Sequence, residues 1–162
     1  NPNPWYYEMQ ELGYNYRASA IHCALGLSQL AKLDRFLAHR RNLAAAYDKA
    51  LVPLAPAVRP IPRPEHSSSA WHLFVVSLNY SYFGITRSRL MRNLRRDGIG
   101  TQVHYFPLHR QPFFCETKAE SNLKLRADNY YSSCLSLPFF PDNMEQDVVA
   151  RVVSGLAGIM KK

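Results

Sequence analysis

A helical spacing of apolar residues begins shortly after Ser19, whose hydroxyl can accept a hydrogen bond in the first turn of a helix. The apolar positions that follow recur with a period close to 3.6 residues: Ile21, Ala24, Leu25, Leu27, Leu30, Leu33, Phe36 and Leu37. A second helical stretch continues through Leu43, Ala44, Tyr47 and Leu51. The pattern predicts one long leading helix over residues 19–52, in which Gly26 and Ser28 leave room for a close neighbour or mark a bend.

Prolines end this helix and recur at Pro53, Pro56, Pro60, Pro62 and Pro64. Because proline has no backbone N–H and fixes its φ angle, residues 59–70 ("RPIPRPEHSSSA") are expected to form an extended crossover. Residues 71–78 ("WHLFVVSL") are nearly all apolar and rich in residues that favour strands, which predicts a central strand.

The second half of the chain alternates short helices and strands. Thr86 can cap a helix whose inward-facing residues are Leu90, Met91 and Leu94, and Gly98 suits a left-handed C-cap. Residues 101–105 ("TQVHY") predict a short strand in which His104 points away from Val103 and Tyr105.

A further helix from about residue 120 carries an adjoining set of apolar and aromatic residues: Leu123, Ala127, Tyr130, Tyr131 and Cys134. Residues 135–141 ("LSLPFFP") predict a brief strand, and Asn143 with Gln146 predicts the capped start of a last helix. The fold class is therefore α+β: a small, mainly antiparallel sheet covered by helices, with one long leading helix. That helix has more apolar surface than so small a sheet can cover.

Composition indicates one globular domain. The chain has 162 residues, of which 47% are hydrophobic, with a mean hydropathy of −0.28. No apolar run approaches the roughly 20 residues that cross a bilayer, and the N-terminus has no signal-peptide pattern. Cys23, Cys115 and Cys134 lack metal-type spacing. Cys23 and Cys134 fall on apolar faces, which predicts buried thiols in a reducing cytoplasm.

Twenty Lys and Arg against twelve Asp and Glu give a net charge of +8. Such a balance suits a nucleic acid, a phosphorylated cofactor or a nucleotide-linked substrate. The basic residues are scattered in pairs such as Arg40-Arg41 and Arg95-Arg96, so a solvated basic surface is an equal alternative. No nucleic-acid motif supports a nucleic-acid binder. No ligand spacing supports a metal at the remaining histidines, His22, His39, His66 and His72.

Three segments in series resemble the DegT/DnrJ-type sugar-nucleotide aminotransferases. They are "PWYYEMQELGYNYR" followed by "ALGLSQLAKLDRF", then "GIGTQVHYFPLHRQPFF", then "SCLSLPFFPDN", and they span nearly the whole chain in the family's order. The family consists of enzymes of fold type I that use pyridoxal 5'-phosphate (PLP). "WYYEM", "GLSQLAKLDRF" and "VHYFPLH" are most similar to the branch of pseudaminic acid biosynthesis, which aminates a UDP-linked 4-keto-6-deoxy-N-acetylhexosamine.

The resemblance implies that this chain corresponds to the C-terminal part of the family's chain. It divides into an interface and active-site loop (1–18), a helix linking to a missing large domain (19–52), and a small α+β domain (53–162). The six lysines are Lys32, Lys49, Lys118, Lys124, Lys161 and Lys162, and none lies in a stretch like the family's cofactor-binding lysine motif. A chain without that buried amine is expected to be inactive alone and to hold no PLP covalently. Its start without methionine agrees with a fragment.

In the family, the loop before the long helix crosses a homodimer interface to the partner's cofactor. The resemblance thus implies that Asn15 donates its amide to the PLP phosphate and that Arg17 adds charge or holds the loop. The alternative is an ordinary turn at residues 14–16 and a surface salt bridge at Arg17. The following "ASAIHC" departs from the family by lacking an acid, which removes a favourable charge from the helix start.

His104, Tyr105 and His109 match the family's "VHYxPLH" segment near the substrate. His104 could hydrogen-bond the sugar or its phosphates, and Tyr105 could stack or donate. The alternative for His104 is a core histidine with its hydrogen bonds satisfied. No residue of the chain is assigned a catalytic role.

Two functions follow. The first is a fragment of an enzyme that transfers an amino group from glutamate to a nucleotide-linked keto sugar, for surface polysaccharide or glycan biosynthesis. The second is a stand-alone, non-catalytic module for dimerisation or sugar-nucleotide binding. A fragment should expose an apolar patch and aggregate, whereas a module should be a well-folded monomer or closed dimer.

Overall fold

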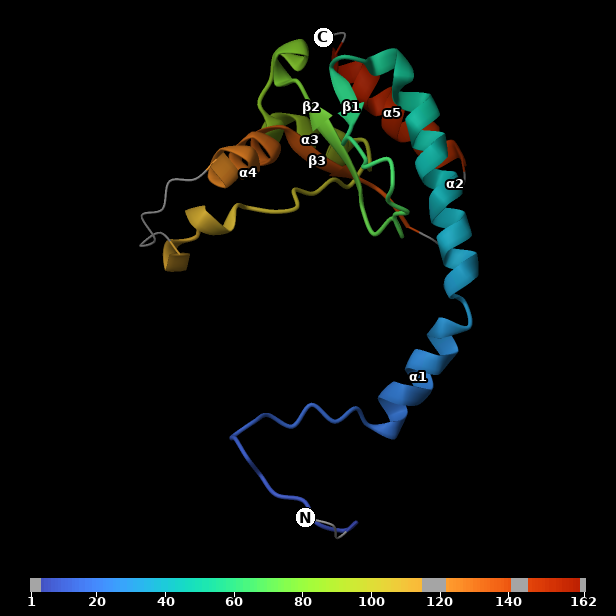
Figure 1. Ribbon diagram of the computed structural model, residues 1–162. Coiled ribbons are helices and arrows are strands. Elements are labelled where there is room, and N and C mark those ends of the chain that lie inside the picture. The colour runs from blue at the N-terminus through green and yellow to red at the C-terminus, as the bar shows by residue number, and fades with distance from the viewer. Residues whose placement is uncertain (1–3, 115–121, 141–145, 161–162) are drawn as a thin grey trace. The chain divides into compact units, whose positions relative to one another are not determined.

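A computed structural model describes residues 4–114, 122–140 and 146–160 of the chain (Figure 1). The chain divides into two compact units, Asn1–Leu33 and Asp34–Lys162. None of the described helices is long and apolar enough to cross a membrane.

The first unit contains an extended segment and helix α1 (Ala20–Leu30). Ser19 caps α1 as predicted, with its hydroxyl oxygen 3.4 Å from the His22 amide nitrogen that donates to it. The helix then breaks at residues 31–32, so the expected long helix is found as α1 and α2 (Leu33–Leu51). No residue of α1 is buried, and the prediction of a buried Cys23 is wrong because no residue that the structure describes in this unit packs over that thiol.

The second unit is built on a three-stranded sheet of order β1-β2-β3. Its strands are β1 (Val58–Pro60), β2 (Phe74–Leu78) and β3 (Cys134–Leu137), and both pairings are antiparallel. The predicted central strand is confirmed as β2. The expected crossover at 59–70 begins inside the edge strand β1, where a terminal proline is tolerated.

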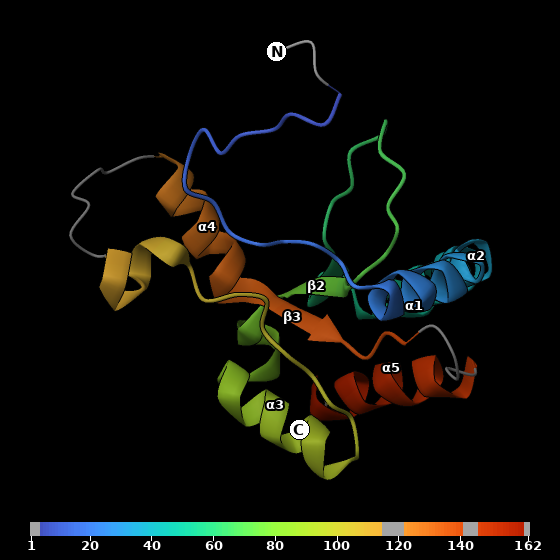
Figure 2. The same ribbon diagram turned by 90° about the horizontal axis from the view of Figure 1, so that it is seen from below.

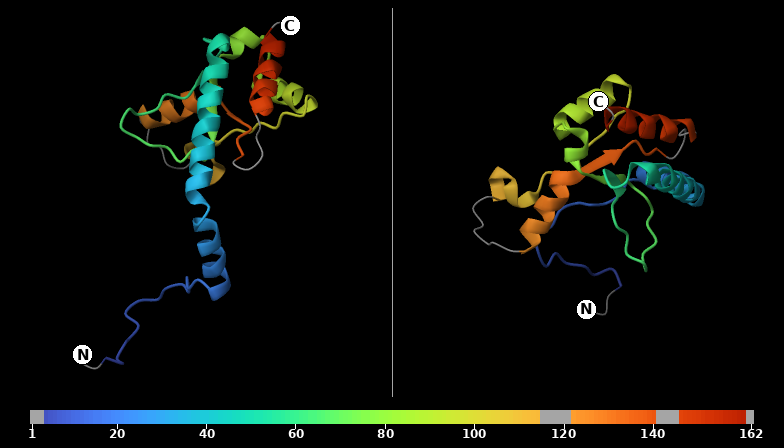
Figure 3. Two further views of the ribbon diagram at one scale, coloured as in Figure 1. Left: turned by 90° about the vertical axis from the view of Figure 1, so that its right-hand side faces the viewer. Right: turned by 90° about the horizontal axis from the view of Figure 1, so that it is seen from above.

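Alternation along the strands separates a core face from a second face. Phe74 and Val76 pair with Leu137 and Leu135, and all four side chains are buried. The core between this face and the helices also contains Leu43, Tyr47, Leu51, Leu90, Leu94, Val149, Val152 and Leu156. These come from α2, α3 (Arg87–Arg96) and α5 (Gln146–Met160), and α3 lies beside α5 (Figures 2 and 3). The predicted α+β class is confirmed.

Local signals define the ends of α3. The Thr86 hydroxyl accepts from the Arg89 amide, and Gly98 adopts φ 73°. The Ile99 amide donates to the Leu94 carbonyl at 2.8 Å and the Gly98 amide to that of Arg95 at 3.1 Å. This is the Schellman arrangement, and both predicted caps are confirmed.

The predicted strand at 101–105 is reduced to one bridge between Gln102 and Ser136. Pairing stops there because the Val103 amide donates to the side-chain oxygen of Gln102, at 2.9 Å, instead of to a neighbouring strand. Helix α4 (Asn122–Ser133) ends before Cys134, which is the first residue of β3 and not of the helix. Cys134 is buried as predicted, and burial raises the pKa of its thiol. The predictions for Cys115, the Leu123 side chain and the Asn143–Gln146 helix start lie outside the described residues.

Tyr47 fastens α2 to the sheet. Its ring stacks on Phe74 with centroids 4.7 Å apart, and its hydroxyl donates to the Pro138 carbonyl at 2.8 Å. Burial raises the pKa of Tyr47.

We predict that Tyr47→Phe lowers the free energy of unfolding by about 1–2 kcal/mol, because the Pro138 carbonyl loses its donor. Urea denaturation measures this. The matched control is Tyr82→Phe at a half-exposed ring, and equal effects of the two substitutions would contradict the role given to Tyr47.

Two glycines of α5 provide a matched test of the contact between α3 and α5. A Cβ at Gly155 would lie 2.7 Å from Ile99 Cδ1 and 3.4 Å from Leu94 Cδ2, whereas a Cβ at Gly158 would meet nothing within 4 Å. Alanine in a helix interior is favoured over glycine by about 0.5–1 kcal/mol. We therefore expect Gly158→Ala to stabilise the protein, and Gly155→Ala to be less stable than Gly158→Ala by about 1 kcal/mol or more. Thermal unfolding of both variants decides the point.

Candidate functional site

Asn15 and Arg17, which the sequence predicts to bind a phosphate, lie in the extended segment of the first unit. The Asn15 side-chain oxygen accepts a hydrogen bond from the Arg17 amide at 3.1 Å. The Tyr14 and Tyr16 rings flank it with centroids 5.8 Å apart, and both are more than four-fifths exposed, at 86% and 87%. This is a local turn, the arrangement that the sequence left open as the alternative.

The chemistry of that turn nevertheless fits a phosphate group. The bond to Arg17 uses the Asn15 amide oxygen and leaves its NH₂ group as a donor. Arg17 is exposed and makes no ion pair with any residue that the structure describes. An amide donor and a free guanidinium two residues apart, just ahead of a helix start, are suitable groups for a dianionic phosphate.

His104 lies in the second unit, where it lines a cavity of about 570 Å³. The residues that line this His104 cavity come from the turn after α3, the end of β3 and α5; they include Gly100, Thr101, Gln102, Ser136, Phe139 and Arg151. The cavity therefore combines one cationic side chain and several polar groups with an apolar wall. That mixture suits a ligand with both polar and apolar parts.

Three contacts set the position of His104. Its Nδ1 lies 2.7 Å from the Ser136 hydroxyl oxygen. The Tyr105 ring meets the imidazole edge-on, with centroids 4.6 Å apart and planes at 83°. Backbone bonds between Gln102 and Ser136, of 2.8 and 3.2 Å, hold the segment against β3. His104 is thus held at β3 by a hydrogen bond, while Tyr105 is 70% exposed.

His109 is committed to a different cluster. Its Nε2 lies 3.0 Å from Asp128 Oδ1, and Arg110 Nε lies 2.8 Å from the same oxygen. These contacts fasten the short 3-10 helix Leu108–Arg110 to α4. The structure therefore places His104 and Tyr105 together and gives His109 a bond to Asp128.

Arg87 ties α3 to the end of α4. It donates to the Tyr131 carbonyl, and its guanidinium lies 4.4 Å from the centroid of the Tyr131 ring. The half-buried Tyr80 lies near this guanidinium. Burial raises the pKa of Tyr80 to about 12, and the charge of Arg87 opposes that rise. The Tyr131 ring also meets the ring of Phe106, two residues after His104, edge-on with centroids 5.5 Å apart.

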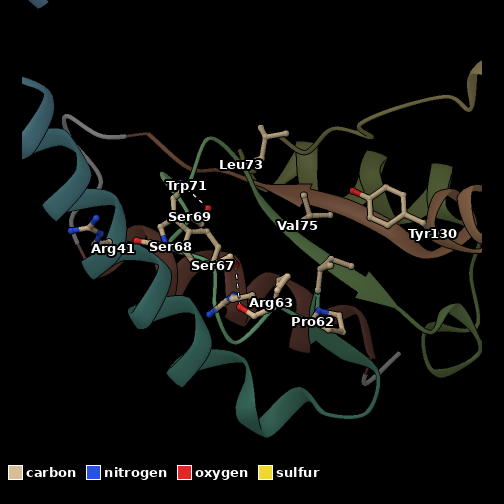
Figure 4. Close-up of a pocket in the computed structure, with 12 residues that line it drawn as sticks. Arg41, Pro62, Arg63, Ser67, Ser68, Ser69, Trp71, Leu73, Val75 and Tyr130 are labelled. Carbon is tan, nitrogen blue, oxygen red and sulfur yellow. Dashed lines mark hydrogen bonds between the residues drawn. The ribbon is translucent and has the colours of Figure 1, made fainter. Parts of the chain in front are cut away.

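A second cavity, of about 510 Å³, lies along β2 (Figure 4). Arg41 on α2 stands at one end of it and Tyr130 on α4 at the other, with Leu73 and Val75 between them. Arg63 at its wall is held by both oxygens of Asp48, at 2.7 and 2.6 Å. The guanidinium of Arg63 also covers the Trp71 ring, 4.3 Å from its centroid.

Two of the three serines that line this cavity also make hydrogen bonds. Ser67 donates to the Pro64 carbonyl, and the Ser69 hydroxyl accepts from the Trp71 amide. Arg63, Ser67 and Ser69 of this cavity therefore make hydrogen bonds within the protein. They leave Arg41 as the main free charge among its lining residues.

Sequence reasoning missed three residues that organise these sites: Ser136, Asp128 and Arg63. No pattern around Ser136 marked it, because its partner His104 is 32 residues away. The only available signal was the period of the strand, which places residue 136 on the face opposite Leu135 and Leu137. In the described part of the chain, no group of three or more acidic, cysteine or histidine residues could hold a metal ion.

Comparison with known proteins identifies the class. Residues 2–157 match the profile of the DegT/DnrJ/EryC1/StrS aminotransferase family. The chain therefore belongs to the DegT/DnrJ/EryC1/StrS aminotransferase family, whose members are PLP-dependent sugar aminotransferases.

Two curated relatives illustrate the match. The chain is 33% identical over 159 residues to the spore coat polysaccharide biosynthesis protein SpsC of Bacillus subtilis, covering 97% of this chain and 40% of SpsC. It is 39% identical over 134 residues to the UDP-4-amino-4,6-dideoxy-N-acetyl-beta-L-altrosamine transaminase of Campylobacter jejuni. That match covers 83% of this chain and 35% of the relative.

Solved structures of sugar aminotransferases also resemble the chain. Helicobacter pylori PseC, an aminotransferase involved in the biosynthesis of pseudoaminic acid, superposes with a TM-score of 0.82 at 25% identity, over 99% of this chain and 42% of its own. DesV of S. venezuelae gives a TM-score of 0.83 at 27% identity, over 99% and 41%. The chain thus spans about two-fifths of the length of the relatives it matches.

The Asp128 cluster gives a test of how the segment beside the site is held. We predict that Asp128→Asn speeds hydrogen exchange at the Arg110 and Gln111 amides by roughly threefold to tenfold, because the carboxylate that accepts from His109 and Arg110 is lost. Global stability should fall by no more than about 1 kcal/mol, since the pair is partly exposed. Exchange monitored by NMR measures the effect. Asp97→Asn, at the C-cap of α3, is the matched control and should leave both amides unchanged.

Proposed function

We propose that the chain supplies the small-domain part of a PLP-dependent aminotransferase that transfers an amino group from glutamate to a nucleotide-linked keto sugar. The product would serve surface polysaccharide or glycan biosynthesis. The observation that carries the proposal is the 39% identity to the C. jejuni transaminase over 134 residues. The family match over residues 2–157 supports the reaction class.

We infer further that the substrate is the UDP-linked 4-keto-6-deoxy-N-acetylhexosamine of pseudaminic acid biosynthesis. The similarity to PseC supports this choice, at a TM-score of 0.82 over 99% of the chain. So do the segments "WYYEM", "GLSQLAKLDRF" and "VHYFPLH". The similarity to SpsC keeps amination of a spore coat precursor as the nearest competing substrate assignment.

The cofactor's phosphate would be held by Asn15 and Arg17 in a homodimer, with these groups reaching the partner's site. PLP would supply the electron sink that amino-group transfer requires. On the substrate side, His104 and Tyr105 would bind oxygen atoms of the sugar nucleotide. His109, on the segment that Asp128 fastens to α4, would bind the substrate close to them. The net charge of +8 favours attraction of both anionic ligands.

No lysine of the chain lies in a stretch like the family's cofactor motif. We infer that a preceding large domain provides the lysine, and that the 162-residue chain alone catalyses no transamination. The competing function is a stand-alone module that dimerises or binds sugar nucleotides. It is favoured by the same missing lysine, and it is opposed by the retained cofactor and substrate motifs.

Two measurements test the proposal. Reading the coding sequence upstream of Asn1 should show an in-frame large domain with a lysine motif. The complete enzyme should then aminate a UDP-linked 4-keto-6-deoxy-N-acetylhexosamine with glutamate, detected by mass spectrometry. A stop codon or an unrelated sequence upstream would replace catalysis with the binding module. Amination of a different keto sugar would leave the class intact and overturn the substrate.

Asn15 provides the sharpest mutational test of the cofactor assignment. In the complete enzyme we predict that Asn15→Asp weakens PLP binding by roughly ten- to hundredfold, because a carboxylate replaces the amide donor next to the phosphate. Asn15→Ala should weaken binding less, since it removes the donor without adding negative charge. Spectroscopic titration of PLP measures the affinities. Asn79→Asp, outside the loop, is the control, and unchanged PLP affinity in Asn15→Asp would reject the role.

A further inference from the structure

Ser136 is the one polar residue that is buried in the described part of the chain, and only 4% of it is exposed. Its backbone is fully used: the amide donates to the Gln102 carbonyl at 2.8 Å, and the carbonyl accepts from the Gln102 amide at 3.2 Å. A buried hydroxyl in such a place needs a partner of its own.

The partner is His104. The Ser136 hydroxyl oxygen lies 2.7 Å from His104 Nδ1 and, among the described residues, has no other hydrogen-bond partner. If Nδ1 carried a proton and donated it, the hydroxyl hydrogen would be left buried without an acceptor, which is costly. If Nδ1 is unprotonated, the hydroxyl donates to it and every group is satisfied. The bond therefore runs from Ser136 to His104.

This direction fixes the tautomer of His104. A neutral imidazole whose Nδ1 accepts must carry its proton on Nε2. The Tyr105 ring, packed edge-on at 4.6 Å, restricts rotation of the imidazole. Nε2 is the ring nitrogen on the side away from Ser136, and His104 is one of the residues that line the 570 Å³ cavity.

We propose that Ser136 is a positioning residue that holds His104 as a hydrogen-bond donor through Nε2–H. His104 then recognises an acceptor oxygen of the ligand and does not serve as a proton acceptor. This inference deepens the proposed function and rests on it for the identity of the ligand. Arg151, on the α5 wall of the same cavity, adds a positive charge. The pair of donors suits an oxygen-rich anionic ligand, as a sugar nucleotide is.

The tautomer can be measured without any ligand or activity. Long-range ¹H–¹⁵N NMR of the 162-residue chain separates Nδ1-protonated from Nε2-protonated imidazoles, and His104→Asn identifies the His104 signals among the six histidines. We expect the Nε2–H pattern at neutral pH, a shift toward a mixture of tautomers in Ser136→Ala, and recovery in Ser136→Thr, which keeps the hydroxyl.

Two results would overturn the positioning role. One is an Nδ1–H pattern in the unaltered chain, which reverses the direction of the bond. The other is an unchanged His104 pattern in Ser136→Ala. Circular dichroism shows whether that variant is folded, and if it is not, the tautomer of the unaltered chain decides alone.

The donor role is tested in the complete enzyme with two substitutions of His104. The glutamine amide nitrogen reaches the position of Nε2, whereas the shorter asparagine reaches only that of Nδ1. We expect His104→Asn to raise KM for the sugar nucleotide roughly ten- to hundredfold and His104→Gln to recover most of that loss, both with kcat nearly kept. Equal losses of kcat in both variants would overturn the role, because they would show that His104 exchanges a proton. If the unaltered enzyme aminates no sugar nucleotide, the proposed function fails and the NMR result still decides the tautomer.

Discussion

The second unit depends on one buried aromatic contact, the stacking of Tyr47 on Phe74. Trp71 and Phe139 extend the stack, with centroids 5.8 and 6.0 Å from that of Phe74. The hydroxyl of Tyr47 also donates to the carbonyl of Pro138, directly after β3. A single side chain of α2 thus fixes both the central strand and the exit of β3. Because Ser136 lies on β3, the position of His104 is set ultimately by this contact.

The site results from the two-residue period of the sheet. Leu135 and Leu137 of β3 point into the core opposite Val76 and Phe74, so Ser136 must point to the second face, opposite Val75. A serine there would normally contact solvent. It is buried because the bridge to Gln102 brings the following residues, including His104, over that face. The same bridge that ends regular pairing therefore creates the hydrogen bond on which the site depends.

The sequence predicted those features that depend on neighbours along the chain. Ser19 and Thr86 cap helices, Gly98 adopts the left-handed conformation, and β2 is central, because each depends on a local preference or an apolar run. The strand expected at 101–105 failed because the Gln102 side chain takes the amide of Val103, a competition that periodicity does not encode. The partnership of His104 with Ser136 also escaped prediction, since only the folded sheet brings the two together.

The two groups of candidate binding residues differ in the contacts that hold them in place, and this difference bears on function. His104 is fixed by contacts to β3 within its own unit, whereas Asn15 and Arg17 share only a local turn, on a segment next to a helix with no buried residue. Ile21, Leu25, Leu27 and Leu30 of that helix are between 59% and 81% exposed. Apolar groups in such number are stabilised by burial against another surface. Asn15 and Arg17 thus lie beside a helix whose apolar side chains are uncovered within their own unit, while His104 is positioned by the folded second unit.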